Sequence, residues 1–145
     1  MNNIYALAQI KGNEKYPNII GYAFFKPVNS GIICQIEINN LPNKKDYEWF
    51  PIHIHGGENC SMKNGKFNNI KEHYNPENKP HPYHKGDLPV LFSNNGYAFM
   101  TFYTTNLKLS EIENKLVVIH EPSDNDNPTT FGEKIACGKI EMLTL

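Results

Sequence analysis

The sequence is poor in the features that mark nucleic-acid-binding, membrane-spanning or disulfide-scaffold proteins. It has no arginine, so all 14 basic residues are lysines, and with 15 acidic residues the formal net charge is −1. That balance argues against a nucleic-acid partner or an acidic membrane surface. No run of about 18 apolar residues is present, which argues against a membrane-spanning helix. Three cysteines, Cys34, Cys60 and Cys137, are too few for a disulfide scaffold and leave room for one bridge and one thiol.

The first 15 residues also lack a secretion signal. They contain neither a basic n-region nor an apolar h-region. We therefore expect a cytoplasmic protein, with an export signal already removed as the open alternative. At 145 residues, with 39% hydrophobic and 20% charged residues, the chain has the size and composition of one globular domain. We expect a single domain over residues 1–145.

Alternating apolar and polar residues predict strands from one end of the chain to the other. Ala6, Ala8 and Ile10 fall on one face of residues 4–11, and Cys34 and Ile36 belong to a similar series in residues 31–40. The predicted strands are 4–11, 18–25, 31–40, 47–55, 88–92, 96–103, 115–120 and 134–142. Many short strands with almost no helix indicate an antiparallel sandwich or barrel.

The connections between these strands are of three kinds. Residues 94–96, Asn-Asn-Gly, predict a tight hairpin. Ser110 and Glu113 have the spacing of a capping box and predict one short helix. Residues 56–87 and 121–133 are polar and show little alternation, and a loop as long as the first is uncommon unless it is functional.

The histidines are the residues most suggestive of chemistry. There are six, and none precedes residue 53: His53, His55, His73, His81, His84 and His120. His53 and His55 are two apart on a predicted strand, so both side chains project from one face, with Cα atoms about 6.7 Å apart. That separation suits two ligands on one metal, and Ile54 must then point to the opposite face.

A second group of candidate ligands lies in the segment HPYHKGD at residues 81–87. His81, His84 and Asp87 form a nitrogen and oxygen donor set that zinc accepts, and His73 is the nearest candidate for a fourth ligand. Gly86 is expected to permit a tight turn before Asp87.

Each of these histidine patterns also has a purely structural interpretation. His120 ends an apolar run, and a lone histidine at a strand end is more often structural than a ligand. His-x-His and HPYHKGD can each occur without a metal. All of these interpretations would have to hold together for the protein to be metal-free, which makes a metal site the better prediction.

The order of the motifs resembles the copper-zinc superoxide dismutase family. The matching pieces are IHIH at 52–55, Cys60, HYNP at 73–76, His81, HKGDLP at 84–89, VVIHEPSD at 117–124 and GEKIACG at 132–138. The resemblance implies an all-β fold, an eight-stranded antiparallel Greek-key β-barrel or sandwich with two long functional loops. It also implies an enzyme that dismutates superoxide to oxygen and hydrogen peroxide.

The same resemblance implies two cofactors and their ligands. Copper, the redox-cycling ion, would be held by His53, His55, His73 and His120. A structural zinc would be held by His73, His81, His84 and Asp87. His73 would bridge the two ions as an imidazolate and act as a catalytic residue.

Further roles follow from the resemblance rather than from the residues alone. Asp124 is similar to the carboxylate of the family that lies behind the ligands and links the two sites, with Asp126 as the competing candidate. Cys60 and Cys137 match the disulfide of the family, which leaves Cys34 as a buried side chain.

The sequence departs from the family pattern at the residue beside copper and in the loops. Lys134 occupies the position of the usual arginine; it keeps the positive charge but loses the planar fork. His81 and His84 are closer together than usual, and residues 121–133 form a short loop. We therefore expect an open copper site with weaker steering of the anion, with Lys134 as its catalytic cation.

The sequence leaves open two alternatives to the enzyme, and it leaves open the oligomeric state. The main alternative is a non-enzymatic metal-binding β-domain, either a zinc-stabilised structural protein or a copper binder or chaperone. A second is a family member that keeps zinc but rarely meets copper in its cell. Superoxide is the expected partner, with no nucleic acid and no membrane, and the sequence leaves open whether the chain forms a homodimer.

Overall fold

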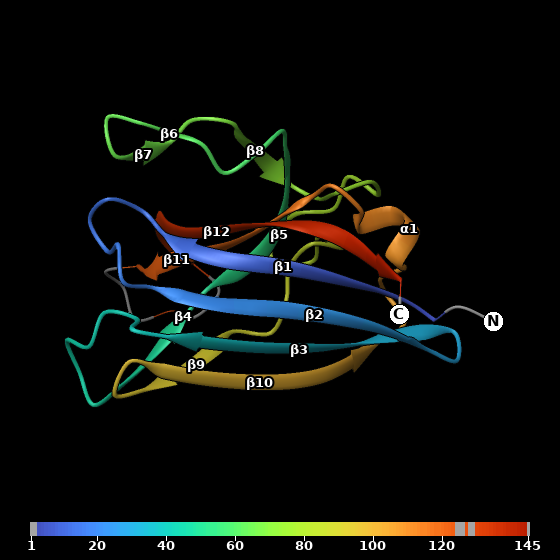
Figure 1. The fold of residues 1–145 in the computed structure, drawn as a ribbon, viewed down its shortest axis with the longest axis horizontal. Helices are drawn as coiled ribbons and strands as arrows, with labels where there is room; N and C mark the ends of the chain where they lie inside the picture. The colour runs from blue at the N-terminus through green and yellow to red at the C-terminus, as the bar shows by residue number, and fades with distance from the viewer. Residues whose placement is uncertain (1–2, 124–126, 128–129, 145) are drawn as a thin grey trace.

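The computed structural model describes residues 3–123, 127 and 130–144 and shows an all-β protein (Figure 1). Most of the chain forms one curled antiparallel sheet of ten strands. The strands are β1 (Ile4–Gly12), β2 (Ile20–Val28), β3 (Gly31–Asn39), β4 (Tyr47–Phe50), β5 (Ile52–Gly57), β6 (Met62–Lys63), β7 (Lys66–Phe67), β8 (Ile70–His73), β9 (Leu91–Asn94), β10 (Tyr97–Thr104), β11 (Leu116–Pro122) and β12 (Phe131–Thr144). Within the described ranges, α1 (Leu109–Ile112) is the one helix, and no helix is long and apolar enough to cross a membrane.

The strand order shows that the sheet curls back on itself. The order is β4-β9-β10-β3-β2-β1-β12-β11-β5-β8, so β4 is at one edge and β5 is next to the opposite edge. Only Pro51 separates these two strands in the chain. The edges must therefore approach each other, and the His120 N–H donates a hydrogen bond of 2.9 Å to the Pro51 carbonyl at that point.

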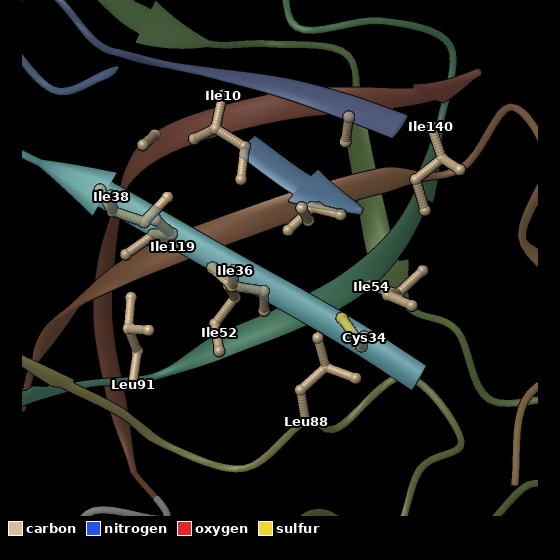
Figure 2. Close-up of a cluster of buried hydrophobic side chains, with 14 of the residues drawn as sticks. Ile10, Cys34, Ile36, Ile38, Ile52, Ile54, Leu88, Leu91, Ile119 and Ile140 are labelled. Atoms are coloured by element: carbon tan, nitrogen blue, oxygen red, sulfur yellow. The ribbon is translucent and has the colours of Figure 1, made fainter. Parts of the chain in front are cut away.

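The hydrophobic core fills the inside of the curled sheet, as the alternation predicted. Ala6, Ala8 and Ile10 of β1 are all fully buried, as are Cys34 and Ile36 of β3. Figure 2 shows isoleucine side chains from several strands meeting in this cluster. Ile54 of β5 belongs to it as well, so the two histidines beside Ile54 face away from the core.

The turn between β9 and β10 agrees with the prediction from Asn-Asn-Gly. Asn95 has φ of 50° and Gly96 has φ of 80°, and both lie between the paired residues Asn94 and Tyr97. Two successive positive φ angles are the requirement of a type I′ hairpin, and asparagine and glycine meet it with least strain. This hairpin fixes the register between β9 and β10.

Three predictions about local structure were wrong in detail. The run 47–55 is two strands, because Pro51 has no N–H to offer a ladder. The predicted capping box is absent: the N-cap of α1 is Lys108, without a side-chain hydrogen bond, and Glu113 is its C-cap. The segment 56–87 is not without structure, because it contains β6, β7 and β8, which lie above the main body of the sheet in Figure 1.

The disulfide joins Cys60 and Cys137, with Cα atoms 5.7 Å apart, and Cys34 is a free, buried thiol. Burial raises the pKa of the Cys34 thiol to about 12, so this thiol stays protonated. Leu116, Val118 and Cys137 form a small second apolar cluster, covered by Cys60 and Ile70. The bridge therefore ties the segment after β5 to the middle of β12.

We predict that the Cys60–Cys137 bridge contributes about 4 kcal/mol to the free energy of unfolding, because it closes a loop with a sequence separation of 77 residues. The double variant Cys60→Ser/Cys137→Ser should lose most of that amount in urea unfolding. A reducing agent should destabilise the wild-type protein and Cys34→Ala but should have no further effect on the double variant. Equal sensitivity of all three proteins to the reducing agent would contradict the prediction.

Candidate metal centre

All six histidines and Asp87 converge on one side of the sheet. His53 and His55 come from β5, His73 from the end of β8 and His120 from β11. His81, His84 and Asp87 come from the segment between β8 and β9. Donor atoms of His53, His55, His73 and His120 all lie within 4.8 Å of one another, and so do those of His53, His73, His81 and Asp87. The structure therefore brings together every predicted ligand, from four separate segments.

His55 and His120 are each fixed by a hydrogen bond to a backbone carbonyl. The Nδ1–H of His55 donates to the Lys71 carbonyl at 2.7 Å, and the Nδ1–H of His120 donates to the Gly132 carbonyl at 3.0 Å. In the neutral tautomer that this requires, the Nε2 atom of each ring carries a lone pair. The two Nε2 atoms lie 3.2 Å apart.

This arrangement favours a cation between the rings. Burial lowers the pKa of His55 to about 3 and that of His120 to about 4, so both imidazoles are neutral, which is the form that binds metals. Burial also holds the pKa of His53 far below its usual range, and neighbouring histidines act in the same direction. The Nδ1 atom of His53 is buried and has no hydrogen-bond partner among the described residues. A buried set of neutral imidazoles is a ligand set that suits copper.

The second group is organised around Asp87. Its carboxylate oxygens lie 2.9 Å from His73 Nδ1, 3.3 Å from His81 Nδ1 and 3.3 Å from His84 Nδ1. His73 Nδ1 and His84 Nδ1 are 3.1 Å apart. A tetrahedral zinc site with bonds of about 2.0–2.1 Å has edges of about 3.3 Å, so these separations fit a zinc ion.

Asp87 is ionised in this setting. Its burial opposes ionisation, but hydrogen bonds from His73 and from the His84 N–H outweigh that effect and lower the pKa of the carboxyl. An ionised carboxylate supplies the negative charge that offsets a divalent cation in a site where the Asp87 side chain is only 5% exposed.

His73 is shared by the two groups. Its Nδ1 is directed at Asp87 and His84. Its ring lies next to those of His53 and His55, with centroids 4.0 Å and 4.5 Å away. The second nitrogen, Nε2, is therefore left for the group that contains His53, His55 and His120.

Backbone hydrogen bonds attach the ligand-bearing segment to β5. The Ile54 N–H donates to the Gly86 carbonyl at 2.7 Å, the Tyr74 N–H donates to the Ile54 carbonyl at 2.8 Å, and the Gly86 N–H donates to the Tyr74 carbonyl at 2.9 Å. A Cβ on Gly86 would lie 2.3 Å from the Ile54 carbonyl oxygen. The tight turn that the sequence predicted before Asp87 is present, because the Asp87 N–H donates a hydrogen bond of 3.0 Å to the His84 carbonyl. The close approach of the Ile54 backbone adds a second reason for glycine at this position.

Lys134 lies beside the copper-type group. It is the register partner of His120, and its positive charge helps to lower the pKa values of His55 and His120. The neighbouring Glu133 forms an exposed ion pair with Lys66 at 3.9 Å, which partly offsets its negative charge. Asp124 and the competing Asp126 lie outside the described residues, so their predicted role stays a prediction.

Sequence reasoning missed three features of the site. Two are the carbonyls of Lys71 and Gly132, which no side-chain pattern reveals. The third is Phe131, whose ring contacts four of the histidines, with centroids 4.9 Å to 5.2 Å away. A signal for it existed: Phe131 is the one aromatic residue in the polar segment 121–133, directly before the GEKIACG motif.

Comparison with known proteins agrees with the family resemblance of the sequence motifs. The sequence model of the family "Copper/zinc superoxide dismutase (SODC)" matches residues 19–140. A copper-zinc superoxide dismutase of Legionella pneumophila is 35% identical over 136 residues, which cover 86% of this chain and 80% of that protein. Superoxide dismutase 1, of the copper-zinc type, from Aquifex aeolicus is 27% identical over 140 residues, covering 84% of this chain and 80% of that protein.

A solved structure supports the similarity of the fold. The Cu/Zn superoxide dismutase from Brucella abortus superimposes with a TM-score of 0.72 at 26% sequence identity. The match covers 94% of this chain and 99% of that one.

We predict that Gly86→Ala destabilises the metal-free protein by about 1–3 kcal/mol, because the added Cβ must displace backbone. The variant should also bind less zinc, since the displaced residue precedes Asp87. Gly56→Ala is the matched control, because its Cβ would meet nothing closer than 3.8 Å. Urea unfolding of the metal-free proteins, followed by zinc titration, measures both effects. Equal stability of the two variants would contradict the prediction.

Proposed function

The chain belongs to the copper/zinc superoxide dismutase family and dismutates superoxide to oxygen and hydrogen peroxide, and we propose the residues and ions through which it does so. Copper is held by His53, His55, His73 and His120. Zinc is held by His73, His81, His84 and Asp87. The observation that carries this assignment is the position of His73, whose Nδ1 faces the Asp87 group while its ring adjoins His53 and His55.

The donor chemistry differs between the two groups in the way these ions require. Four imidazoles suit copper(II), which favours nitrogen donors arranged near a plane. Three imidazoles and one carboxylate at tetrahedral separations suit zinc. Bound copper supplies the one-electron redox chemistry, and bound zinc supplies a fixed positive charge.

The residues of the chain supply position, charge and a proton. Carbonyls of Lys71 and Gly132 hold His55 and His120 in one tautomer, so that both Nε2 atoms keep their lone pairs. His73 would ligate copper through Nε2 or, when that nitrogen is free of copper, hold a proton there for the peroxide product, while its Nδ1 stays directed at the Asp87 group. Lys134 attracts the superoxide anion to the copper group through its charge.

A zinc-stabilised structural domain is the main alternative, and one observation argues against it. Zinc needs only His73, His81, His84 and Asp87, and four separations between their donor atoms are 2.9–3.3 Å, close to the edge of a zinc tetrahedron. Such a domain would have no use for the buried set of His53, His55 and His120. Burial of these three neutral rings, each at most 3% exposed, is costly unless a ligand uses their nitrogens.

We predict one copper and one zinc per chain after reconstitution with both ions, measured by elemental analysis. His120→Ala should lose copper and at least 100-fold of the superoxide dismutation rate while retaining zinc, because His120 belongs to the copper set alone. His81→Ala should lose zinc first, because His81 belongs to the zinc set. Zinc binding without any copper uptake in excess copper would contradict the proposed function.

We predict that Lys134→Glu slows dismutation at least tenfold at low salt, because it reverses the charge next to the copper group. At about 8 Å and an effective dielectric of about 20, each unit charge is worth about 2 kcal/mol before screening. The loss should shrink as salt rises, since the Debye length is about 8 Å at physiological ionic strength. Lys134→Arg is the control and should match or exceed the wild type. Equal rates for all three proteins at low salt would mean that Lys134 does not act on the substrate.

A further inference from the structure

Phe131 has an unusual position for a large apolar side chain. It is the first residue of β12 and is 42% exposed. The histidines beneath it are buried: His53 is 3% exposed and His120 is 1% exposed. The ring therefore forms an outer layer between solvent and the histidine centre.

The ring contacts members of both metal groups. Its centroid lies 4.9 Å from that of His120, 5.0 Å from His73, 5.1 Å from His81 and 5.2 Å from His53. It is inclined by 43° to 75° to these four imidazoles, so it meets them edge to face or tilted rather than flat. One side chain thus covers the shared histidine together with part of each group.

The backbone on either side of the ring is held in place. Phe131 pairs with Pro122 across a bulge in the β11–β12 ladder. The next residue, Gly132, accepts the hydrogen bond from His120 Nδ1. The ring is therefore anchored to a copper ligand through one neighbouring residue, and its position follows that of His120.

An anion that reaches copper has to share this space with the ring. Lys134, three residues further along β12, offers the charge that draws an anion inward. Phe131 offers no hydrogen bond and no charge, and its bulk occupies the volume next to His53 and His120. The two residues consequently act in opposite directions on a small anion.

We propose that Phe131 is the residue that limits access of anions to the copper ligand set, by covering it with a ring that has to shift before an anion binds. This inference rests on the proposed function, because it assumes that copper is held by His53, His55, His73 and His120. Its consequence is selectivity by size: a compact anion needs a small shift of the ring, and a bulky one needs a large shift.

The test uses the copper- and zinc-loaded protein and azide as a compact anionic probe. Azide affinity and association rate are measured from the visible absorption of the copper(II) form in the wild type, Phe131→Ala, Phe131→Leu and Phe131→Trp. We expect affinity to fall with side-chain size, in the order Ala, Leu, wild type, Trp. Phe131→Ala should bind azide about fivefold more tightly than the wild type, which corresponds to about 1 kcal/mol.

Phe99→Ala is the matched control. Phe99 is also an exposed phenylalanine on a strand, 52% exposed on β10, and makes none of the ring contacts of the histidine centre. It should bind azide like the wild type. The electron paramagnetic resonance spectrum of copper(II) without azide should be the same in every protein, because the proposal leaves the ligand positions unchanged.

Wild-type azide affinity in the Ala, Leu and Trp variants would overturn the proposal. An altered copper spectrum without tighter azide binding in the Ala and Leu variants would also overturn it, because Phe131 would then position the histidines rather than limit access. If the wild-type protein takes up no copper, both the proposed function and this inference are wrong. If it takes up copper but its azide affinity does not depend on residue 131, only this inference is wrong.

Discussion

The hydrogen bonds between Ile54, Gly86 and Tyr74 are the interactions on which the metal centre depends most. Ile54 places its side chain in the core and its backbone against Gly86 and Tyr74, so one residue joins the interior of the sheet to the ligand-bearing segment. The same contact brings Asp87 into a β-bridge with His53. Without it, the proposed zinc ligands His81, His84 and Asp87 would belong to a separate loop, and His73 would have no reason to lie between the two groups.

The protonation states of the histidines follow from the burial that these backbone hydrogen bonds produce. Neutral imidazoles are imposed on His55 and His120 by burial, and two backbone carbonyls decide which nitrogen of each ring carries the hydrogen. The result is a cluster of lone pairs with one ionised carboxylate at its edge, which is a surrounding that only a cation satisfies. The protein therefore defines the two groups by its own hydrogen bonds, and the ligand types decide which ion suits each.

Side chains were easier to predict than backbone from this sequence. The spacing of His53 and His55, the order of the motifs and the apolar alternation led to most of the strands, to a set of histidines that lie together and to the disulfide, because each depends on a local pattern or a family resemblance. The tight turn at Gly86 was predicted correctly, but its close approach to the Ile54 backbone was not, since such an approach leaves no trace in a sequence. Phe131 was missed, because one aromatic residue in a polar loop carries no periodic signal. The single-domain boundary, the cytoplasmic location and the role of Asp124 stay predictions.

The pairing of β1 with β12 has a consequence for how the protein is made. Residues 4–12 lie beside residues 131–144 in the sheet, although synthesis separates them by most of the chain. The hairpins of β1, β2 and β3 can form while the ribosome is still working, because their contacts are local. The free edge of β1 can pair with β12 only after β12 has left the ribosome. That last strand also carries Phe131, Lys134 and Cys137. The sheet can therefore close, the disulfide can form and Phe131 can cover the histidines only after this strand has been synthesised.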